Sequence, residues 1–407
     1  MRVLAVTVGG TPDPVITCLK EHKPAFTLFF VSGQSKDLLR RMPNGNPGIL
    51  TTAVLPDGAY CAVVVDHHDD FASCYRTMRD EMHRIQREFK DGEFIADYTG
   101  GTKSMTAALV AAAFRLGWKL SLIQAPREDL NRAHLTGVPT VQSVTPLVLD
   151  EVKDRVQLLF SVRDYEGAEA ILTEAIRELT LDPAARTSLV MVVNLLRGLA
   201  RWDQFGYIDA YAHLRACGEV CREILPHLAR LEEFARSGDC PPYELVADLV
   251  ANAEGRAAQG RYEDAVLRLY RAVELLAQVR LALAHGLETG DLDLEKVPGS
   301  LRRELAPRDG RKATAGLVNA YLILASLGDP LGHVYQSDGW DKRLRELLLL
   351  RNKAFMEHGF RPLGEEEWER AHRIAREFLG KGAEAIKVRM VIPSPPKWER
   401  VAALLPT

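Results

Sequence analysis

An arginine and a histidine stand seven positions apart near the end of the chain, in the stretch RNKAFMEHGF. The planar guanidinium of Arg351 can hold a phosphate and offset charge that develops on it. The imidazole of His358 titrates near neutral pH, so it can take the proton of a ribose 2′-hydroxyl or protonate a leaving 5′-oxygen. Asn352 could orient the phosphate or the backbone. These residue types suit metal-independent RNA cleavage, and Arg351, His358 and Asn352 are the predicted catalytic residues.

The spacing of this pair raises a geometric question. The stretch from Asp341 to Gly359 is strongly helical, and seven residues make about two turns, so one helix would separate Arg351 and His358 by ~10 Å. Phe355 would lie between them on the same face. Two such helices, packed antiparallel about a symmetry axis, could bring both pairs to one cleft. The competing interpretation is that both are solvated residues of a charged helix.

Two glycine-containing loops follow strand-like runs in the first half of the chain. One is GGTPD after RVLAVTV, and the other is TGGTKS after EFIADY. Gly100 and Gly101 let a ligand approach the backbone closely. Lys103 places a cation at the start of a helix, whose free N–H groups already favour anions. Three further positions of this loop offer hydroxyls: Thr99, Thr102 and Ser104. The pattern indicates a phosphate-bearing ligand, although an ordinary strand-to-helix turn remains an alternative.

Neither loop matches a standard nucleotide motif. TGGTKS fails the P-loop template because Thr102 separates the glycine from the lysine, and GGTPD lacks the dinucleotide fingerprint G-x-G-x-x-G. These departures count against ATP hydrolysis and NAD chemistry. A nucleotide-dependent enzyme that uses this domain therefore stays only as a minor hypothesis.

Composition narrows the class of protein. The 407 residues are 47% hydrophobic and 26% charged, which is globular and fits two or three domains. A formal net charge of −3 argues against coating of long nucleic acids by bulk charge, but not against a local basic cleft. No C-x-x-C pair occurs among the six cysteines, so no metal site is expected. The N-terminus lacks the shape of a signal peptide and no apolar run reaches a membrane span of ~20 residues, so we expect a soluble, cytoplasmic protein.

Alternating elements must position the two loops. Apolar strand-like runs cover residues 2–8, 26–33, 59–65, 93–98 and 118–124, and helical runs cover 13–21, 71–89 and 105–116. Such alternation predicts a parallel sheet covered on both faces, a Rossmann-like architecture. In these sheets ligands lie outside the carboxyl ends of the strands, near the switch in strand order.

Only helices are expected after about residue 146, apart from a small edge strand within 386–396. Two long helices are predicted over 262–286 and 341–359, the second ending at Gly359. Three segments share a Tyr-x-x-Ala core, typical of packed helical hairpins, although unequal spacing weakens the case for a regular array. Their residues are Tyr165 and Ala168, Tyr207 and Ala210, and Tyr262 and Ala265. The predicted domains are residues 1–147, a helical connector at 148–245, and an all-helical domain at 246–407.

These motifs together resemble the CRISPR-associated CARF–HEPN ribonucleases, ancillary effectors of type III CRISPR systems. VTVGGTPDP and DYTGGTKSMTAAL are similar to the two ligand loops of a CARF domain. RYEDAVLRLYRAVELLAQ and LLLRNKAFMEHGF are similar to a HEPN domain and its R-x(4–6)-H motif. The resemblance is weakest over about 150–245. It would make 1–147 the CARF domain and 246–407 the HEPN domain.

The resemblance implies an activated nuclease. CARF domains dimerise and bind cyclic oligoadenylate, and the ligand activates a HEPN dimer that cuts single-stranded RNA without a metal or other cofactor. Cyclic tetra-adenylate is the preferred activator and cyclic hexa-adenylate the alternative. Carried over by position, the ligand site comprises Gly9, Gly10, Thr11, Ser32, Gly33, Thr99, Gly100, Gly101, Thr102, Lys103 and Ser104. The implied partners are a second copy of the chain, RNA and the cyclic activator, with neither a membrane nor stable DNA binding.

A non-catalytic CARF-type nucleotide sensor, such as a transcription regulator, is the main alternative. That function needs a helix-turn-helix with a basic recognition helix. No convincing one follows residue 150, so the sequence favours the ribonuclease.

Overall fold

The computed structural model describes residues 1–43, 45–124, 138–179, 181–306, 312–355 and 360–406. Two compact units divide the chain, one built mainly from Met1–Arg155 and Ile171–Val190, the other from Val156–Ala170 and Met191–Leu404. Over the described residues, no helix combines the length and apolar character that a membrane span requires.

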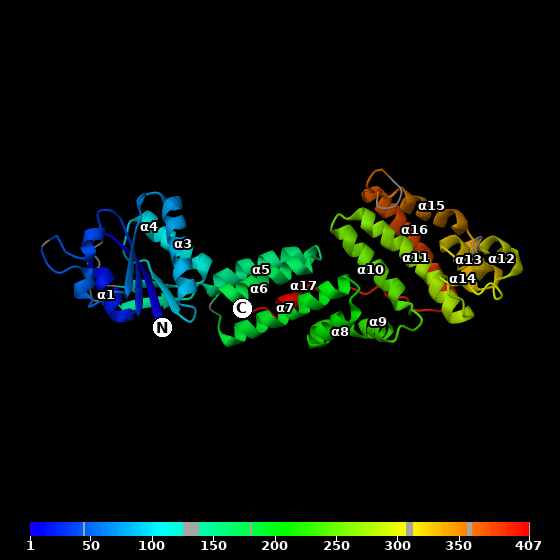
Figure 1. Cartoon of the computed structure of the whole chain (residues 1–407), viewed down its shortest axis with the longest axis horizontal. Coiled ribbons are helices and arrows are strands. Elements are labelled where there is room, and N and C mark those ends of the chain that lie inside the picture. Colours follow the sequence, from blue (N-terminus) through cyan, green and yellow to red (C-terminus); the bar gives the residue numbers. More distant parts are fainter. Residues whose placement is uncertain (44, 125–137, 180, 307–311, 356–359, 407) are drawn as a thin grey trace. The chain divides into compact units, whose positions relative to one another are not determined.

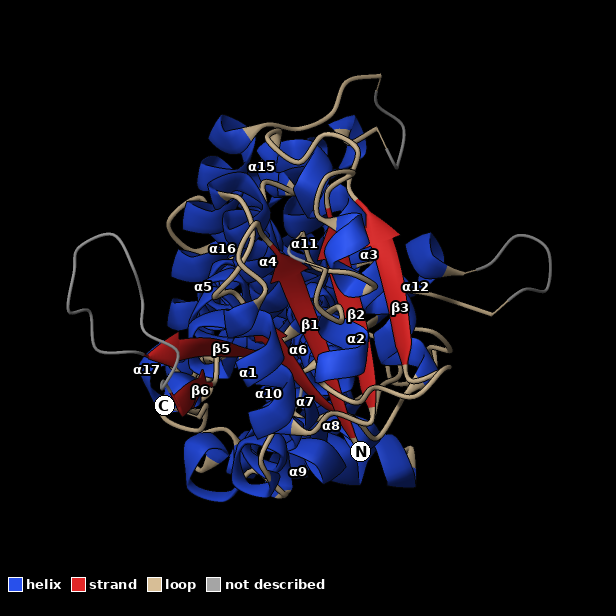
Figure 2. Ribbon diagram, turned by 90° about the vertical axis from the view of Figure 1, so that its left-hand side faces the viewer, coloured by secondary structure: helices blue, strands red, loops and turns tan. Residues whose placement is uncertain are grey.

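A six-stranded sheet forms the centre of the first unit, in the order β3-β2-β1-β4-β5-β6. The strands are β1 (Arg2–Val8), β2 (Phe26–Val31), β3 (Tyr60–Val64), β4 (Glu93–Asp97), β5 (Lys119–Gln124) and β6 (Val138–Gln142). The first five pair in parallel, and β1, β2 and β3 lie side by side in Figure 2. The predicted Rossmann-like sheet is confirmed. Antiparallel β6 was not predicted, because VPTVQ is short and contains Pro139, which is tolerated at a sheet edge.

Helices cover both faces of this sheet, because successive strand residues point to opposite sides. Val3 and Ala5 pack with α3 (Phe71–Glu88) and α4 (Lys103–Leu116). Leu4 and Val6 face the opposite side. That side is covered by α1 (Asp13–His22), η1 (Lys36–Leu39) and α2 (Ile49–Thr52).

The middle of the chain is helical, as predicted. Its elements are α5 (Thr145–Ser161), α6 (Tyr165–Glu178), α7 (Pro183–Asp203), α8 (Tyr207–Arg215), η2 (Gly218–Cys221) and α9 (Leu225–Ser237). Each tyrosine of the Tyr-x-x-Ala segments begins a helix: α6, α8 or α11. The three alanines are fully buried, which confirms them as packing positions: Ala168, Ala210 and Ala265.

The C-terminal helices pack around α11 (Figure 1). The elements are α10 (Glu244–Ala258), α11 (Tyr262–His285), α12 (Gly299–Leu305), α13 (Leu317–Ser326), α14 (Pro330–Gln336), α15 (Trp340–Lys353) and α16 (Glu365–Ala385). The last helix, α17 (Trp398–Ala402), lies with the middle helices instead, and the Trp398 ring centroid is 5.5 Å from that of Phe160 on α5. α11 contacts α10, α13, α15 and α16. An aromatic cluster fills the core, with the Phe378 ring centroid 5.2 Å from those of Tyr321 and Trp340.

Two predictions about this region are wrong. The helix that carries Arg351 ends at Lys353, because Ala354 takes an extended conformation (ψ 138°) in which its methyl is fully buried. The helix is therefore shorter than predicted. His358 and the predicted helix end at Gly359 lie outside the described residues. No strand forms within 386–396, all of which is described, since Pro393, Pro395 and Pro396 lack ladder donors.

A buried carboxylate ties two helices of this unit together, α11 and α14. Asp329 caps α14 by accepting a hydrogen bond from the Leu331 N–H (2.9 Å), and it also accepts from Arg280 Nε (2.8 Å) and His285 Nε2 (2.9 Å). Burial opposes ionisation, but these hydrogen bonds outweigh it and lower the carboxyl pKa. The stabilisation is therefore present above the unfolded pKa and is lost as pH falls through the folded value.

Asp329→Ala is expected to lower the free energy of unfolding by about 3 kcal/mol, because it removes the N-cap of α14 and the buried partner of both Arg280 and His285. Urea denaturation at neutral pH measures the change. The control is Glu233→Ala on α9, which removes an exposed carboxylate 3.0 Å from Arg230 and should shift stability little. Equal stability of the two variants would contradict the assignment.

Candidate functional site

Three of the predicted ligand segments meet at the carboxyl edge of the sheet. β1 pairs with β2 on one side and with β4 on the other, so the strand order switches around β1. Gly9 follows β1, Ser32 follows β2 and Thr99 follows β4 closely. Parallel strands place these ends on one edge, which is where open α/β sheets bind ligands.

Glycines let the loops after β1 and β4 touch. A Cβ on Gly9 would lie 2.8 Å from the backbone nitrogen of Gly101. Gly101 has φ +98°, and its Cβ would lie 2.7 Å from that of Thr7. The carbonyl of Gly100 accepts hydrogen bonds from the hydroxyls of Thr7 and Thr106, the latter at 2.9 Å. The fold itself thus requires these glycines, beyond any need of a ligand.

The hydroxyls of the second loop hold neighbouring segments of backbone. Thr102 Oγ1 caps α4 by accepting from the Met105 N–H (3.2 Å) and donates to the His68 carbonyl (2.8 Å). Ser104 Oγ donates to the Asp69 carbonyl (2.9 Å). Thr99 Oγ1 accepts from the Ile123 N–H (2.9 Å). The sequence predicts these hydroxyls as ligand groups. In the structure each is hydrogen-bonded to backbone groups of the protein.

Other predicted ligand residues face solvent. Gly10, Thr11, Gly33 and Lys103 are exposed. A Cβ on Gly10 or Gly33 would meet nothing within 4 Å, so open space lies before both backbones. Ser32 differs, since it is buried and exchanges hydrogen bonds with Ser35. The accessible groups are therefore a flexible ammonium, a hydroxyl and glycine backbone.

Arg351 lies in the last turn of α15 and is half-buried. Its Nη1 donates to Asn352 Oδ1 (3.0 Å), and its Cζ lies 5.3 Å from the ring centroid of Tyr270 on α11. A cation above an aromatic face is attracted to it, so both neighbours hold the guanidinium in place. Asn352 orients Arg351 in this arrangement. Sequence reasoning missed Tyr270, because the contact joins helices that are distant along the chain.

Exposed aromatic side chains flank the predicted catalytic segment. Phe355 is 65% exposed and Phe360 94% exposed, on either side of the undescribed residues 356–359. Aromatic faces stack on unpaired bases, typically with ~1–3 kcal/mol per base. Phe355 lies four positions after Arg351 in the sequence, and its exposure is known only from the structure.

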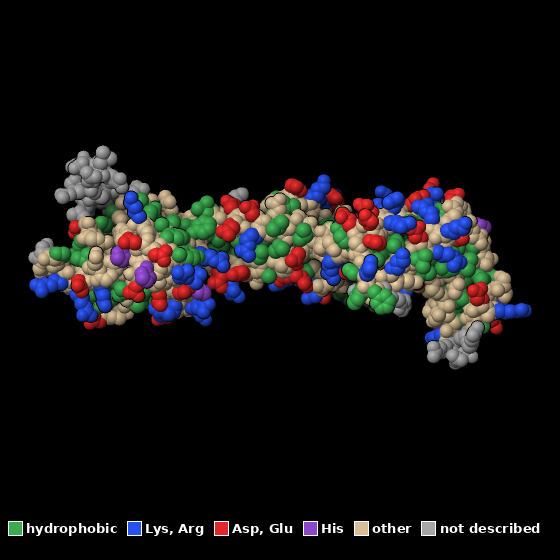
Figure 3. Space-filling model, turned by 90° about the horizontal axis from the view of Figure 1, so that it is seen from above, with side chains coloured by type: hydrophobic (Ala, Val, Ile, Leu, Met, Phe, Trp, Pro, Cys, Tyr) green, Lys and Arg blue, Asp and Glu red, His purple; other side chains and the backbone are tan. Residues whose placement is uncertain are grey.

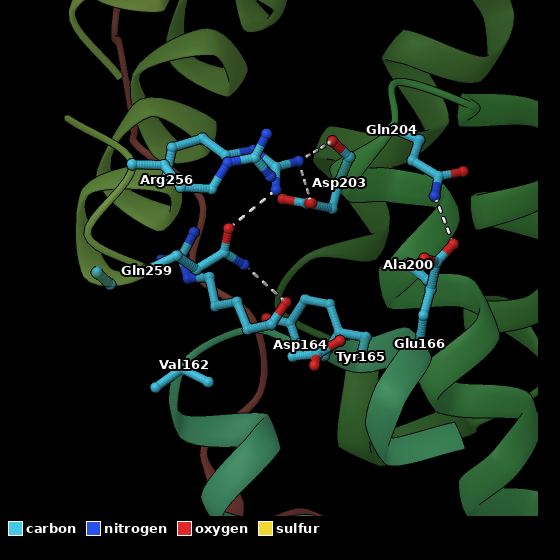
Figure 4. A pocket seen from close by; sticks show the side chains of 12 residues that line it. Val162, Asp164, Tyr165, Glu166, Ala200, Asp203, Gln204, Arg256 and Gln259 are labelled. Carbon is cyan, nitrogen blue, oxygen red and sulfur yellow. Dashed lines mark hydrogen bonds and ion pairs between the residues drawn. The ribbon is translucent and has the colours of Figure 1, made fainter. Parts of the chain in front are cut away.

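A cavity of about 590 Å³ lies between the α5–α6 turn, α7 and the α10–α11 turn (Figure 4). Arg256 pairs with Asp203 and donates to Gln259 Oε1 (3.0 Å), and Gln204 donates to Glu166 (2.7 Å). Burial raises the pKa of Asp203, while Arg256 opposes this rise. The charged side chains that line the cavity all have partners: Arg163, Asp164, Glu166, Asp203, Arg256 and Arg261. These interactions hold neighbouring helices together, so the lining of the cavity is better explained by helix packing than by catalysis.

The surface shows no broad field of one sign on the face in Figure 3. Lys and Arg side chains alternate with Asp and Glu over that face. This mixture of signs agrees with the formal net charge of −3.

Comparison with known families identifies the C-terminal region. Residues 237–381 match the family described as the Csm6 HEPN domain, and this range includes Arg351, Asn352 and His358. A comparison with curated protein sequences finds no match.

Solved structures give a match over the whole chain. Csm6 from Enterococcus italicus, bound to cyclic hexa-2′-fluoro-hexa-dAMP, aligns at TM-score 0.64 and 11% identity, covering 99% of this chain and 98% of that one. Can2 from Sulfobacillus thermosulfidooxidans, in complex with cyclic tetra-adenylate, covers 48% of this chain and 58% of its own at 13% identity and TM-score 0.26. Protein VC1899 from Vibrio cholerae covers 67% and 68% at 12% identity and TM-score 0.27.

Only the Csm6 likeness bears on the fold, since the other two scores are too low to carry an argument. It matches a chain with the same succession of Rossmann-like sheet and helices along its whole length. The family match adds the sequence pattern of the C-terminal helices. Residues 237–381 therefore match the Csm6 HEPN domain family, and the whole chain shares the fold of the Enterococcus italicus Csm6.

Proposed function

We propose that this protein is a cytoplasmic, homodimeric endoribonuclease, activated by cyclic oligoadenylate, that cuts single-stranded RNA without metal in type III CRISPR antiviral defence. One observation carries the proposal. A Csm6-type HEPN region containing Arg351 and His358 occurs in the same chain as a Rossmann-like domain with open glycine loops at its switch point.

The activator is proposed to bind over the loops after β1, β2 and β4. Exposed Gly10 and Gly33 leave room for a bulky ligand, and Lys103 at the start of α4 supplies a cation for its phosphates. Lys103 has no hydrogen-bond or ion-pair partner among the described residues, so it is available to an anion. A ring with twofold symmetry suits a twofold protein dimer.

Catalysis is proposed to use transesterification within the RNA. The 2′-oxygen attacks the adjacent phosphorus, the bond to the 5′-oxygen breaks, and a 2′,3′-cyclic phosphate and a 5′-hydroxyl result. His358 takes the 2′-proton or supplies the proton to the 5′-oxygen. Arg351, oriented by Asn352 and Tyr270, stabilises charge on the phosphate oxygens.

A titration with rings of different size tests this proposal. Cleavage of a fluorophore-labelled single-stranded RNA is followed against cyclic tetra- and hexa-adenylate, each with and without EDTA. We expect weak basal cleavage that rises steeply with one ring and persists in EDTA. The family resemblance favours the tetra-adenylate, whereas the six-unit ring in the Enterococcus Csm6 structure makes the hexa-adenylate an equal candidate.

Two outcomes would overturn the proposal. Loss of all cleavage on adding EDTA would exclude the metal-independent chemistry. Failure of both rings to stimulate cleavage would exclude the activation. A gel shift with duplex DNA serves as the control, since ring-dependent DNA binding without RNA cleavage would favour the regulator instead.

A further inference from the structure

Three side chains with metal-binding atoms converge beneath the loop after β4. Cys18 and His22 lie one turn apart on α1, and Asp97 is the last residue of β4. Their exposed fractions are 0%, 4% and 3%. The thiol sulfur, an imidazole nitrogen and a carboxylate oxygen all lie within 4.8 Å of one another.

The carboxylate of Asp97 is buried without a cation among the described residues. It accepts hydrogen bonds from Ser121 Oγ (2.7 Å) and the Thr99 N–H (3.1 Å), and Ser121 Oγ also meets His22 Nε2 at 2.9 Å. No Lys or Arg of the described residues lies within ion-pair distance of Asp97, so a bound cation would find this buried carboxyl group available.

We propose that Cys18, His22 and Asp97 bind a zinc ion. Thiolate sulfur, imidazole nitrogen and carboxylate oxygen are the three ligand types that Zn²⁺ takes in proteins. Thiolate and carboxylate together would neutralise its charge. Ligand distances of about 2.0–2.3 Å imply tetrahedral donor separations of roughly 3.3–3.6 Å, so the side chains need move inward by about one ångström. Ser121 Oγ or a water would complete the coordination.

The proposed zinc site lies next to the loop after β4. Asp97 accepts from the Thr99 N–H, and Thr99 opens the segment that continues through Gly100 and Gly101. The carbonyl of His22 in turn accepts from Arg2 Nη1 at 2.7 Å. A bound ion would thus cross-link α1 and β4 beside the carboxyl edge of the sheet and hold the loop after β4 in place.

The sequence gives a zinc site little support because no C-x-x-C pair occurs. A Cys-x-x-x-His spacing on a helix is common by chance, and Asp97 joins it only through the pairing of β1 with β4. The inference does not depend on RNA cleavage or on activator binding.

Cobalt titration of the full-length chain tests the site. Protein stripped of metal is titrated with Co²⁺, then Zn²⁺ is added as competitor. We expect one Co²⁺ per chain, a thiolate-to-cobalt charge-transfer band with intense tetrahedral d–d bands, and loss of both on addition of Zn²⁺. Zn²⁺ should also raise the melting temperature of the stripped protein, because it binds only the folded state.

Variants assign the signal to these residues. Cys18→Ser should abolish the charge-transfer band, and Asp97→Asn should weaken Co²⁺ binding at least about 10-fold. Cys74→Ser is the matched control, since Cys74 is equally buried but packs on the opposite face of the sheet. A wild-type chain with neither a band nor a change in melting temperature would show a hydrogen-bonded network only. A band that survives Cys18→Ser would place the metal elsewhere, and the wild-type titration decides the matter if a variant fails to fold.

Discussion

Arg351→Ala is expected to reduce activated RNA cleavage by about 100- to 1000-fold, the usual loss when a donor to a developing anion is removed. The guanidinium is held by Asn352 at 3.0 Å and by the Tyr270 ring, so its direction is fixed before RNA arrives. Single-turnover cleavage at saturating activator measures the loss, because this isolates the chemical step from binding and product release. His358→Ala should cause a loss at least as large, through removal of the proton-transfer group.

The controls separate chemistry from folding and charge. Lys353→Ala removes an exposed cation from the same turn of α15 and should cleave as the wild type does. The double variant of Arg351 and His358 should be little worse than the poorer single variant, since groups that act as one unit are not additive. Activator binding should stay unchanged in all of them. Wild-type cleavage by either single alanine variant would show that the assignment is wrong.

Gly101→Ala is expected to weaken activator binding at least about 10-fold while leaving basal RNA cleavage in place. The residue has φ +98°, and its new methyl would lie 2.7 Å from Thr7 Cβ, so the loop after β4 must leave its position. Backbone strain of this kind costs ~1–3 kcal/mol, which should also appear as a lower melting temperature. Fluorescence anisotropy with a labelled ring measures the affinity.

Gly10→Ala provides the comparison for this loop. Gly10 has open space around its Cβ position and no positive φ, so the fold should accept a methyl without loss of stability. Any fall in affinity for that variant would report direct contact with the ring. Unchanged affinity and stability of Gly101→Ala would contradict the packing of the two loops.

Strands and long helices could be predicted because each is encoded locally. β1, β2 and β4 are continuous apolar runs, and the Tyr-x-x-Ala segments repeat one packing position at each helix start. Their alternation was enough to place the two glycine loops at one edge of a sheet. The meeting of the two loops at one edge of the sheet could therefore be predicted from the sequence.

What could not be predicted depends on contacts between distant segments. Ala354 is a strong helix former, yet α15 stops before it, and its methyl is buried in the core of the packed helices. Tyr270 meets Arg351 only once α11 and α15 pack together. The hydroxyls of Thr102 and Ser104 were expected to face a ligand, but the neighbouring carbonyls of His68 and Asp69 lie within their reach.

The close approach of Gly9 to Gly101 has a consequence for engineering ligand preference. A selection for altered ring size that randomises these glycines would mostly return misfolded clones, since even one methyl intrudes upon neighbouring main chain. Diversity is better introduced at Thr11 and Lys103, whose side chains project into water and whose replacement leaves the scaffold unaltered.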